Sequence, residues 1–212
     1  MNDTRALRAS IVDTARGMSA LGINRGKSGN VSARIDTGFL ITPSGLAYAA
    51  TMPADIVAVD LDGNATGRRT PSSEWRFHRD IYAARSDVAA IVHAHATFAT
   101  TLACLDRGIP AFHYMIAIAG GSDIRCAPYA TFGTQALSDH AVRALDERRA
   151  CLLSHHGMIA VGPSLAAALE LAVEVETLAE MYWRALAIGE PAVLGADAMA
   201  AVLARFATYG KP

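Results

Sequence analysis

The sequence predicts one layered domain in which strands alternate with helices, of the α/β or α+β class. Two observations carry this prediction. Short runs rich in Val, Ile, Leu and Phe, bounded by Gly, Pro or Asp, alternate with longer stretches whose apolar residues recur at helical spacing. The chain has 212 residues, of which 52% are hydrophobic, which is enough for one domain with a full core. We therefore expect a single domain over residues 1–212.

Composition and charge exclude several classes of protein. The formal net charge is −1, so the chain lacks the basic footprint of a nucleic-acid-binding protein. No apolar run has transmembrane length, and the N-terminal residues lack the apolar core of a signal peptide, so we expect no membrane partner. The cysteines are Cys104, Cys126 and Cys151, an odd number without Cys-x-x-Cys spacing. This pattern indicates reduced thiols in a cytoplasmic protein.

The N-terminal part predicts a helix followed by short strands and turns. Thr4 is placed to cap a helix over residues 4–21, in which Ile11 and Met18 belong to an apolar stripe at helical spacing. The elements expected next are a Gly- and Ser-rich turn over 26–32, a strand over 39–42 that runs into a turn at 43–45, a strand over 56–61, and a hairpin turn at Asp62-Gly63.

The rest of the chain continues the alternation. Ser72 or Ser73 is a natural N-cap for a helix over 74–84, and Ser164 for a long helix over 165–188. The other expected elements are a strand over 89–96, a helix over 97–106, extended segments over 109–116 and 124–129, a helix from Thr134, a strand–turn–strand unit over 150–162, and a short helix over 196–208.

Two histidines, His93 and His95, lie on one expected strand at a spacing that suits a metal ion. Side chains at i and i+2 of a strand point to the same face, about 6.5–7 Å apart along the backbone. Zinc accepts such a pair, and Glu74 and the pair His155-His156 can supply the remaining ligands. Adjacent residues on a strand point to opposite faces, so one histidine of that pair is expected to bind metal and the other to make a structural hydrogen bond or line a wall. The alternative is a set of ordinary polar residues at strand ends.

Three turns of small polar residues are potential anion sites. They are the turns at 26–32 and 43–45 and the first turn of the helix over 74–84, where unpaired N–H groups and the helix dipole favour an anion. The first of them, taken alone, is more often a plain turn than a phosphate site, but the three together could converge on one phosphate. Lysine occurs only as Lys27 and Lys211, which argues against a Schiff base and for metal chemistry in its place.

The chemistry-bearing motifs resemble those of a known family. They are Gly29-Asn30-x-Ser32, Thr42-Pro43-Ser44-Gly45, Ser72-Ser73-Glu74, His93-x-His95 and His155-His156-Gly157. In this order they resemble the class II aldolase/adducin family over most of the chain. Segments 71–78, 113–117, 126–133 and 206–210 are similar to members that act on L-fuculose 1-phosphate. The resemblance implies an α/β fold of three layers (α/β/α), with a central, mainly antiparallel sheet flanked by helices, and a homotetramer whose active sites lie between subunits.

The resemblance also implies roles for single residues. One zinc ion (Zn2+) per subunit would be held by Glu74, His93, His95 and His155, with Glu74 leaving the metal to act as acid/base. The implied phosphate ligands are Gly29, Asn30, Ser44, Gly45, Ser72 and Ser73. Tyr114 would be the second catalytic residue, reaching into a neighbouring subunit's site, and Phe132 and Tyr209 would wall the aldehyde end. Lys27 departs from the fuculose-type members, which carry smaller uncharged residues there, and is either a phosphate contact or a solvated side chain.

The implied activity is the reversible cleavage of a ketose 1-phosphate. A metal-dependent (class II) aldolase, an aldehyde-lyase, would release dihydroxyacetone phosphate through a metal-stabilised enediolate. Glu74 would move the proton at carbon, and Tyr114 the proton on the aldehyde oxygen. The leading substrate is L-fuculose 1-phosphate, which gives L-lactaldehyde; 5-deoxyribulose 1-phosphate and 5-methylthioribulose 1-phosphate are alternatives that differ at the far, weakly discriminating end. A sugar-phosphate 4-epimerase, a dehydratase and a non-catalytic adducin-like domain compete less well, the last because the metal set is intact.

Overall fold

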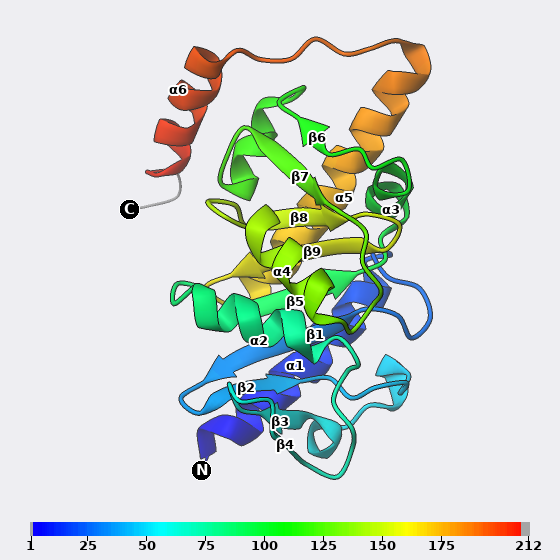
Figure 1. Ribbon diagram of the computed structural model, residues 1–212, viewed down its shortest axis with the longest axis vertical. Helices are drawn as coiled ribbons and strands as arrows, with labels where there is room; N and C mark the ends of the chain where they lie inside the picture. Colours follow the sequence, from blue (N-terminus) through cyan, green and yellow to red (C-terminus); the bar gives the residue numbers. More distant parts are fainter. Residues whose placement is uncertain (1, 209–212) are drawn as a thin grey trace.

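A sheet of nine strands forms the centre of the molecule (Figure 1). The computed structural model describes residues 2–208. The strands are β1 (Asn30–Ile35), β2 (Gly38–Ile41), β3 (Val57–Val59), β4 (Ala65–Thr66), β5 (Ala90–Ala94), β6 (Ile109–Pro110), β7 (Asp123–Ala127), β8 (Ala150–Leu153) and β9 (Gly157–Gly162). Their spatial order is β4-β3-β2-β1-β5-β9-β8-β7-β6. Strands β7 and β8 are parallel, and the other neighbours within the described residues are antiparallel, as predicted.

Helices cover both faces of this sheet. They are α1 (Asn2–Ala20), α2 (Trp75–Ala84), α3 (Thr97–Ala103), α4 (Gln135–Ala144), α5 (Leu165–Ile188) and α6 (Ala196–Phe206), with 3₁₀ segments η1 (Tyr48–Ala50), η2 (Pro53–Asp55) and η3 (Tyr114–Ala119). In Figure 1, α2 and α4 pass in front of the strands, whereas α1 and α5 pass behind them. Helix α3 packs on α5, and α6 packs on η3. The layers are therefore α/β/α, which confirms the predicted fold class.

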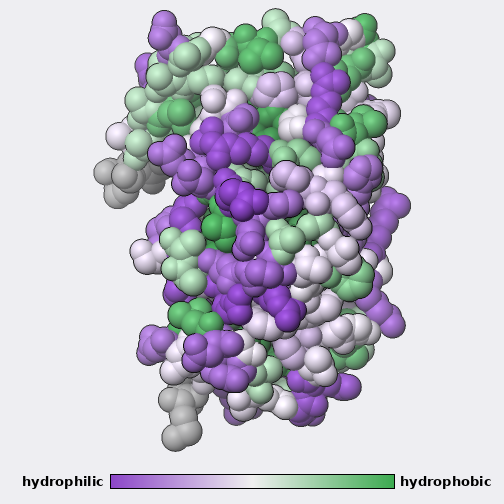
Figure 2. Space-filling view, in the orientation of Figure 1, coloured by the Kyte–Doolittle hydropathy of each residue, from purple (hydrophilic) through white to green (hydrophobic). Residues whose placement is uncertain are grey.

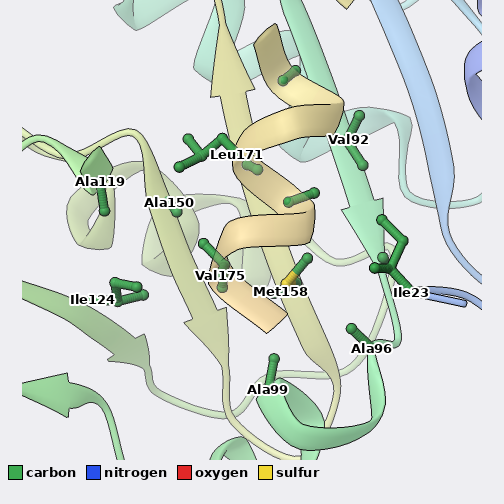
Figure 3. Packing of buried hydrophobic residues seen from close by; sticks show 14 of the residues in the cluster. Ile23, Val92, Ala96, Ala99, Ala119, Ile124, Ala150, Met158, Leu171 and Val175 are labelled. Carbon is green, nitrogen blue, oxygen red and sulfur yellow. The ribbon is translucent and has the colours of Figure 1, made fainter. Parts of the chain in front are cut away.

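The alternation of side chains along the central strands builds two apolar cores. On β5, β8 and β9, successive residues face α5 and then the opposite layer of α2 and α4. Figure 3 shows the first core, in which Val92, Ala150 and Met158 from the strands pack against Leu171 and Val175 of α5. This core is wholly apolar at its centre, so the polar site described below lies on the other face of β5.

The second core lies between the sheet and the layer of α2 and α4. Ile91 and Leu153 from the strands are fully buried there with Phe77 of α2. Between the two helices, the buried Ser138 of α4 donates a hydrogen bond to Asp80 of α2 at 2.6 Å. Hydrophilic side chains occupy much of the middle of this face of the molecule in Figure 2. None of the described helices combines the length and the apolar character that a membrane span requires.

Two local expectations differ from the structure. Residues 109–116 were expected to be extended, but the strand ends at Pro110, and η3 begins at Tyr114 because His113 Nδ1 accepts the Met115 N–H at its start. The turn expected over 26–32 ends earlier than predicted, because Asn30 already pairs with His93 in the β1–β5 ladder. The cysteines Cys104, Cys126 and Cys151 are free thiols, in agreement with their expected reduced state.

The first core generates a stability prediction. Leu152→Ala on β8 should lower the free energy of unfolding by about 2–5 kcal/mol, because a fully buried leucine would be replaced by a cavity next to α5. Chemical denaturation followed by circular dichroism measures this change. Leu61→Ala is the control, since Leu61 is 47% exposed and should change the value by less than about 0.5 kcal/mol. Equal losses in the two variants would contradict the assignment of the core.

Candidate active site

A cavity of about 300 Å³ lies where the start of β1, the end of β5, the N-terminus of α2 and the turn between β8 and β9 meet. These segments are far apart in the sequence, and the antiparallel pairings β1–β5 and β5–β9 bring them to one end of the sheet. The cavity is lined by Lys27, Ser28, Gly29, Asn30, Pro43, Ser44, Gly45, Ser72, Ser73, Glu74, His95, Tyr129, Ala130, Phe132, His155 and His156.

Two of the cluster histidines come from the end of β5, as predicted. His93 lies on the strand face opposite Val92, so its ring is directed toward Phe77 of α2, with ring centroids 5.4 Å apart. Its Nδ1 donates to the Met158 carbonyl on β9 at 2.8 Å, which fixes the ring. His95 follows two residues later, and the centroids of the two imidazole rings are 5.0 Å apart. The i, i+2 rule therefore gave the correct arrangement for this pair.

The third histidine that the structure brings to this pair is His156, whereas His155 was expected to bind the metal. Glu74, His93, His95 and His156 form one group whose potential ligand atoms all lie within 4.8 Å of one another. His155 also lines the cavity but is outside this group, and its Nε2 lies 3.9 Å from Asp106 Oδ2. The physical reason is that residues 154–156 form a turn rather than continuing β8, and His155 has a φ of 53°. The rule for adjacent strand residues does not apply in a turn.

Glu74 stands at the N-terminus of α2, where it is the residue before the first helical turn. Its backbone N–H donates to Ser72 Oγ at 3.3 Å. Its Oε2 accepts from Asn30 Nδ2 at 2.9 Å and lies 3.1 Å from His93 Nε2. Its Oε1 is buried, has no hydrogen-bond partner among the described residues, and lies 3.0 Å from His156 Nε2. The carboxylate thus faces two imidazoles with one oxygen each.

The facing nitrogen atoms indicate a cation site. Because a carbonyl only accepts hydrogen bonds, His93 Nδ1 carries the proton of that ring, and a neutral His93 presents a lone pair at Nε2. That lone pair lies 3.2 Å from His95 Nε2 and close to the carboxylate of Glu74. Such acceptors repel one another unless a proton or a cation lies between them. Three imidazole nitrogens and one carboxylate are the donors of a divalent transition-metal site, so these residues fit a divalent metal ion.

The electrostatics of the cluster favour the metal-binding protonation states of Glu74 and His95. Burial by itself would raise the pKa of Glu74, but His93 and His156 outweigh it and hold that pKa well below its usual value. Burial, and then His93 and His156, lower the pKa of His95 to about 4. Glu74 is therefore ionised and His95 neutral near pH 7, as a carboxylate ligand and an imidazole ligand must be. At His93, burial is outweighed by Glu74 and the Met158 carbonyl, which raise the pKa of that ring, so a metal ion would displace a proton there.

Two glycines allow the backbone to pass close to the histidines. Gly29 has a φ of +76°, and a Cβ there would lie 2.5 Å from the His93 carbonyl oxygen. At Gly157, a Cβ would lie 2.6 Å from the Ala94 carbonyl oxygen and 3.1 Å from the ring of His95. Any larger residue at either position would displace the strand that carries the cluster.

All six residues predicted to bind phosphate line the cavity. Ser72 Oγ accepts hydrogen bonds from Asn30 Nδ2 and from the Glu74 N–H. No described residue accepts its hydroxyl proton, which is therefore available to a ligand. The six residues are Gly29, Asn30, Ser44, Gly45, Ser72 and Ser73. Lys27 also lines this part of the cavity, from an exposed position on its rim.

The outer wall of the cavity comes from exposed aromatic residues. Phe132, which was predicted to be there, is 64% exposed and lies with Tyr129 on the loop before α4. The Tyr129 ring meets the His155 ring edge-on, with centroids 6.1 Å apart. Tyr114 is 50% exposed on η3 and does not line the cavity of its own chain. Tyr209, the other predicted wall residue, lies outside the described residues.

Sequence reasoning missed two features of the site. It favoured His155, whereas the structure brings His156 to the group, although Gly157 directly after His156 was a signal for a tight turn there. It also missed Tyr129, which stands three residues before Phe132 in a segment rich in Pro, Gly and Thr that is typical of an exposed loop. No pattern in the sequence showed that this loop would face the histidines.

Comparison with known proteins agrees with this geometry. A family model described as the class II aldolase and adducin N-terminal domain matches residues 9–183. A 5-methylthioribulose-1-phosphate/5-deoxyribulose-1-phosphate aldolase of Rhodospirillum rubrum is 60% identical over 205 residues, covering 97% of this chain and 93% of the relative. An L-fuculose phosphate aldolase of Escherichia coli K12 is 50% identical over 205 residues, covering 96% and 95%. A solved L-fuculose 1-phosphate aldolase has a TM-score of 0.92 at 40% identity, covering 94% and 95%.

The two neighbouring histidines provide a matched test of the cation site. His156→Ala should lower the affinity for a divalent metal ion by at least about tenfold, since even supporting residues of such sites contribute that much. His155→Ala should leave the affinity unchanged, because His155 is directed toward Asp106. Isothermal titration of the metal-stripped protein with zinc measures both values. A larger loss in His155→Ala than in His156→Ala would refute the ligand set.

Proposed function

This chain belongs to the class II aldolase/adducin family, and from that premise we propose that it cleaves 5-methylthioribulose 1-phosphate and 5-deoxyribulose 1-phosphate. The chain is a class II aldolase, an aldehyde-lyase that acts on a sugar phosphate. The observation that carries the substrate proposal is the 60% identity to the Rhodospirillum rubrum aldolase, against 50% to the Escherichia coli L-fuculose phosphate aldolase. L-Fuculose 1-phosphate, the leading substrate from the sequence, becomes the second candidate.

We propose zinc as the metal, held by Glu74, His93, His95 and His156. Three imidazoles and a carboxylate suit zinc, and a bound divalent cation would polarise the substrate's carbonyl and stabilise negative charge next to it. The protein would keep this set in place through the Met158 carbonyl, which orients His93.

The substrate's phosphate would bind at the small polar turns beside the cluster. The hydroxyl proton of Ser72 is available there, and the dipole of α2 favours an anion at its N-terminus. Phosphate binding would place carbons 3 and 4 of the ketose beside Glu74, without taking part in bond breaking. Lys27 on the cavity rim would add either a direct contact or only a positive potential.

Proton transfer would divide between two residues. In the direction of bond formation, ionised Glu74 would take a proton from carbon 3 of dihydroxyacetone phosphate, and neutral Tyr114 would give its phenolic proton to the aldehyde oxygen as the bond between carbons 3 and 4 forms. Solvent would then reprotonate Tyr114 and deprotonate Glu74, and cleavage would be the reverse of these steps. Tyr114 is exposed and lies outside the cavity of its own chain, so we propose that it serves a neighbouring subunit in a homotetramer. A cytoplasmic location stays a prediction.

A panel of ketose 1-phosphates tests the substrate. The 5-deoxy and 5-methylthio compounds should be cleaved with kcat/KM about 10–100 times that of L-fuculose 1-phosphate, because the extra hydroxyl of the latter would meet the aromatic wall of Tyr129 and Phe132. Release of dihydroxyacetone phosphate, coupled to NADH oxidation, gives the rates. Unphosphorylated 5-deoxyribulose is the control; its cleavage would give dihydroxyacetone and acetaldehyde, and release of the aldehyde, coupled to NADH oxidation by alcohol dehydrogenase, should show it to be a poor substrate. A preference for L-fuculose 1-phosphate would reverse the order of the two candidates.

A subunit-mixing experiment tests the proton-transfer residues. Glu74→Gln and Tyr114→Phe should each lower kcat by about 10²–10⁴-fold, the usual range for loss of an acid/base group. If the site combines Glu74 of one subunit with Tyr114 of another, tetramers mixed at equal amounts should regain about a quarter of wild-type activity. Differently tagged subunits, co-expressed and purified through both tags, provide the mixture. Activity that stays at the level of the single variants would place both residues in one chain or exclude Tyr114.

A further inference from the structure

A buried row of polar side chains leads from the interior of α2 to the carboxylate of Glu74. Tyr82 OH lies 2.8 Å from Ser32 Oγ, which lies 2.7 Å from His78 Nδ1. His78 Nε2 is hydrogen-bonded to Asn30 Oδ1, and Asn30 Nδ2 donates to Glu74 Oε2 at 2.9 Å. All five residues are at least nine-tenths buried. Neither the metal site nor the phosphate site accounts for Tyr82, Ser32 or His78.

The carboxylate of Glu74, at the end of this row, determines which atom donates in each of its hydrogen bonds. The ionised carboxylate of Glu74 only accepts, so the nitrogen of the Asn30 amide must face it. The amide oxygen of Asn30 then faces His78 and requires a donor, which is His78 Nε2–H.

The tautomer of His78 is set by the same reasoning. The ring is completely buried and touches no carboxylate, so it is neutral; burial, and then His93, lower its pKa to about 3. A neutral ring that donates from Nε2 accepts at Nδ1, so Ser32 must donate its hydroxyl proton there. Tyr82 can then donate to Ser32. Every proton in the row therefore points toward Glu74.

The packing around His78 holds the ring in this orientation. It lies between Phe77 and Phe39, with ring centroids 4.6 Å and 6.4 Å away and interplanar angles of 23° and 16°. A rotation of the ring would require both aromatic neighbours to move. The donor at Nε2 is thus presented to Asn30 from a fixed position.

We propose that His78 is a positioning residue of the aldolase reaction, which sets the orientation of the Asn30 amide and through it the position of the Glu74 carboxylate. Asn30 Nδ2 has two hydrogens, and it directs one to Ser72 and the other to Glu74. With the amide reversed, its oxygen would face the carboxylate and the metal ligand would be displaced. The inference rests on the proposed acid/base role of Glu74.

Two substitutions of His78 distinguish a role in positioning Asn30 from a role in packing alone. In H78Q, the glutamine amide nitrogen can replace Nε2 and still donate to Asn30, whereas in H78N the shorter amide reaches only the position of Nδ1. H78N should lower kcat/KM about 10–100-fold, as loss of an outer partner of a metal ligand does. H78Q should stay within about threefold of wild type, because the one hydrogen bond that it loses, to Ser32, is neutral. Thermal unfolding of both variants gives the structural baseline.

Nitrogen NMR of the zinc-loaded wild-type protein tests the tautomer directly. The long-range ¹H–¹⁵N spectrum should show His78, assigned by its absence in H78Q, with protonated Nε2 and unprotonated Nδ1. This measurement stands even if H78N does not fold. Ser32→Ala removes the donor to Nδ1 and should weaken that preference.

Three results would overturn the inference. They are a His78 protonated at Nδ1 in an active aldolase, equal activity of H78Q and H78N, and activities that only follow the melting temperatures. A protein that shows the expected tautomer but cleaves no ketose 1-phosphate would instead overturn the proposed function and leave the hydrogen-bond directions standing. The two failures are therefore distinguishable.

Discussion

The candidate site depends on one constraint: three imidazole rings and the carboxylate of Glu74 must be held close together in a partly buried cavity. The rings of His93, His95 and His156 lie 4.8–5.0 Å apart, and their nitrogen lone pairs converge. Without a proton or a cation between them these acceptors repel one another, so the surrounding backbone must keep the rings at this spacing. The β5–β9 ladder does this, since β9 supplies the carbonyl that fixes His93 and the turn that carries His156. Gly29 and Gly157 let the adjacent chain segments approach without a side chain in between.

The two faces of the sheet separate the polar residues of the candidate site from the apolar core that stabilises the fold. Along β5, Val92 packs toward α5 in an apolar core, whereas His93 on the opposite face meets Phe77 and the polar row of α2. Helix α2 serves both purposes: Phe77 packs in the second core, and His78 is hydrogen-bonded to Asn30, which donates to Glu74. One short helix therefore connects the second core to the candidate metal cluster.

The features that follow local periodicity were predictable from the sequence. The alternation of strands and helices, the long helix after Ser164, and the pair His93 and His95 all follow from the spacing of residues. The features that depend on a turn were not. The structure brings His156 rather than His155 to the group because the turn between β8 and β9 contains a residue with positive φ, His155, and such a turn cannot be read from strand alternation. The contacts of His78 were equally hidden, because Asn30 and Ser32 come from a strand that appeared to be part of a loop. The order of the candidate substrates could not be decided either, since they differ only where the wall is apolar.

The loop between β7 and α4, which carries Tyr129 and Phe132, can vary independently of the metal cluster. Tyr129 and Phe132 stand on an exposed segment between β7 and α4, whereas the metal cluster is anchored in the sheet and the phosphate turns lie beside it. Ala130 of this loop packs against the second core, but the side chains of Tyr129 and Phe132 are exposed, so they can be replaced without disturbing the ladder that carries His93. Under the proposed function, such replacements would change which aldehyde is accepted while the residues proposed to break the carbon–carbon bond stay in place.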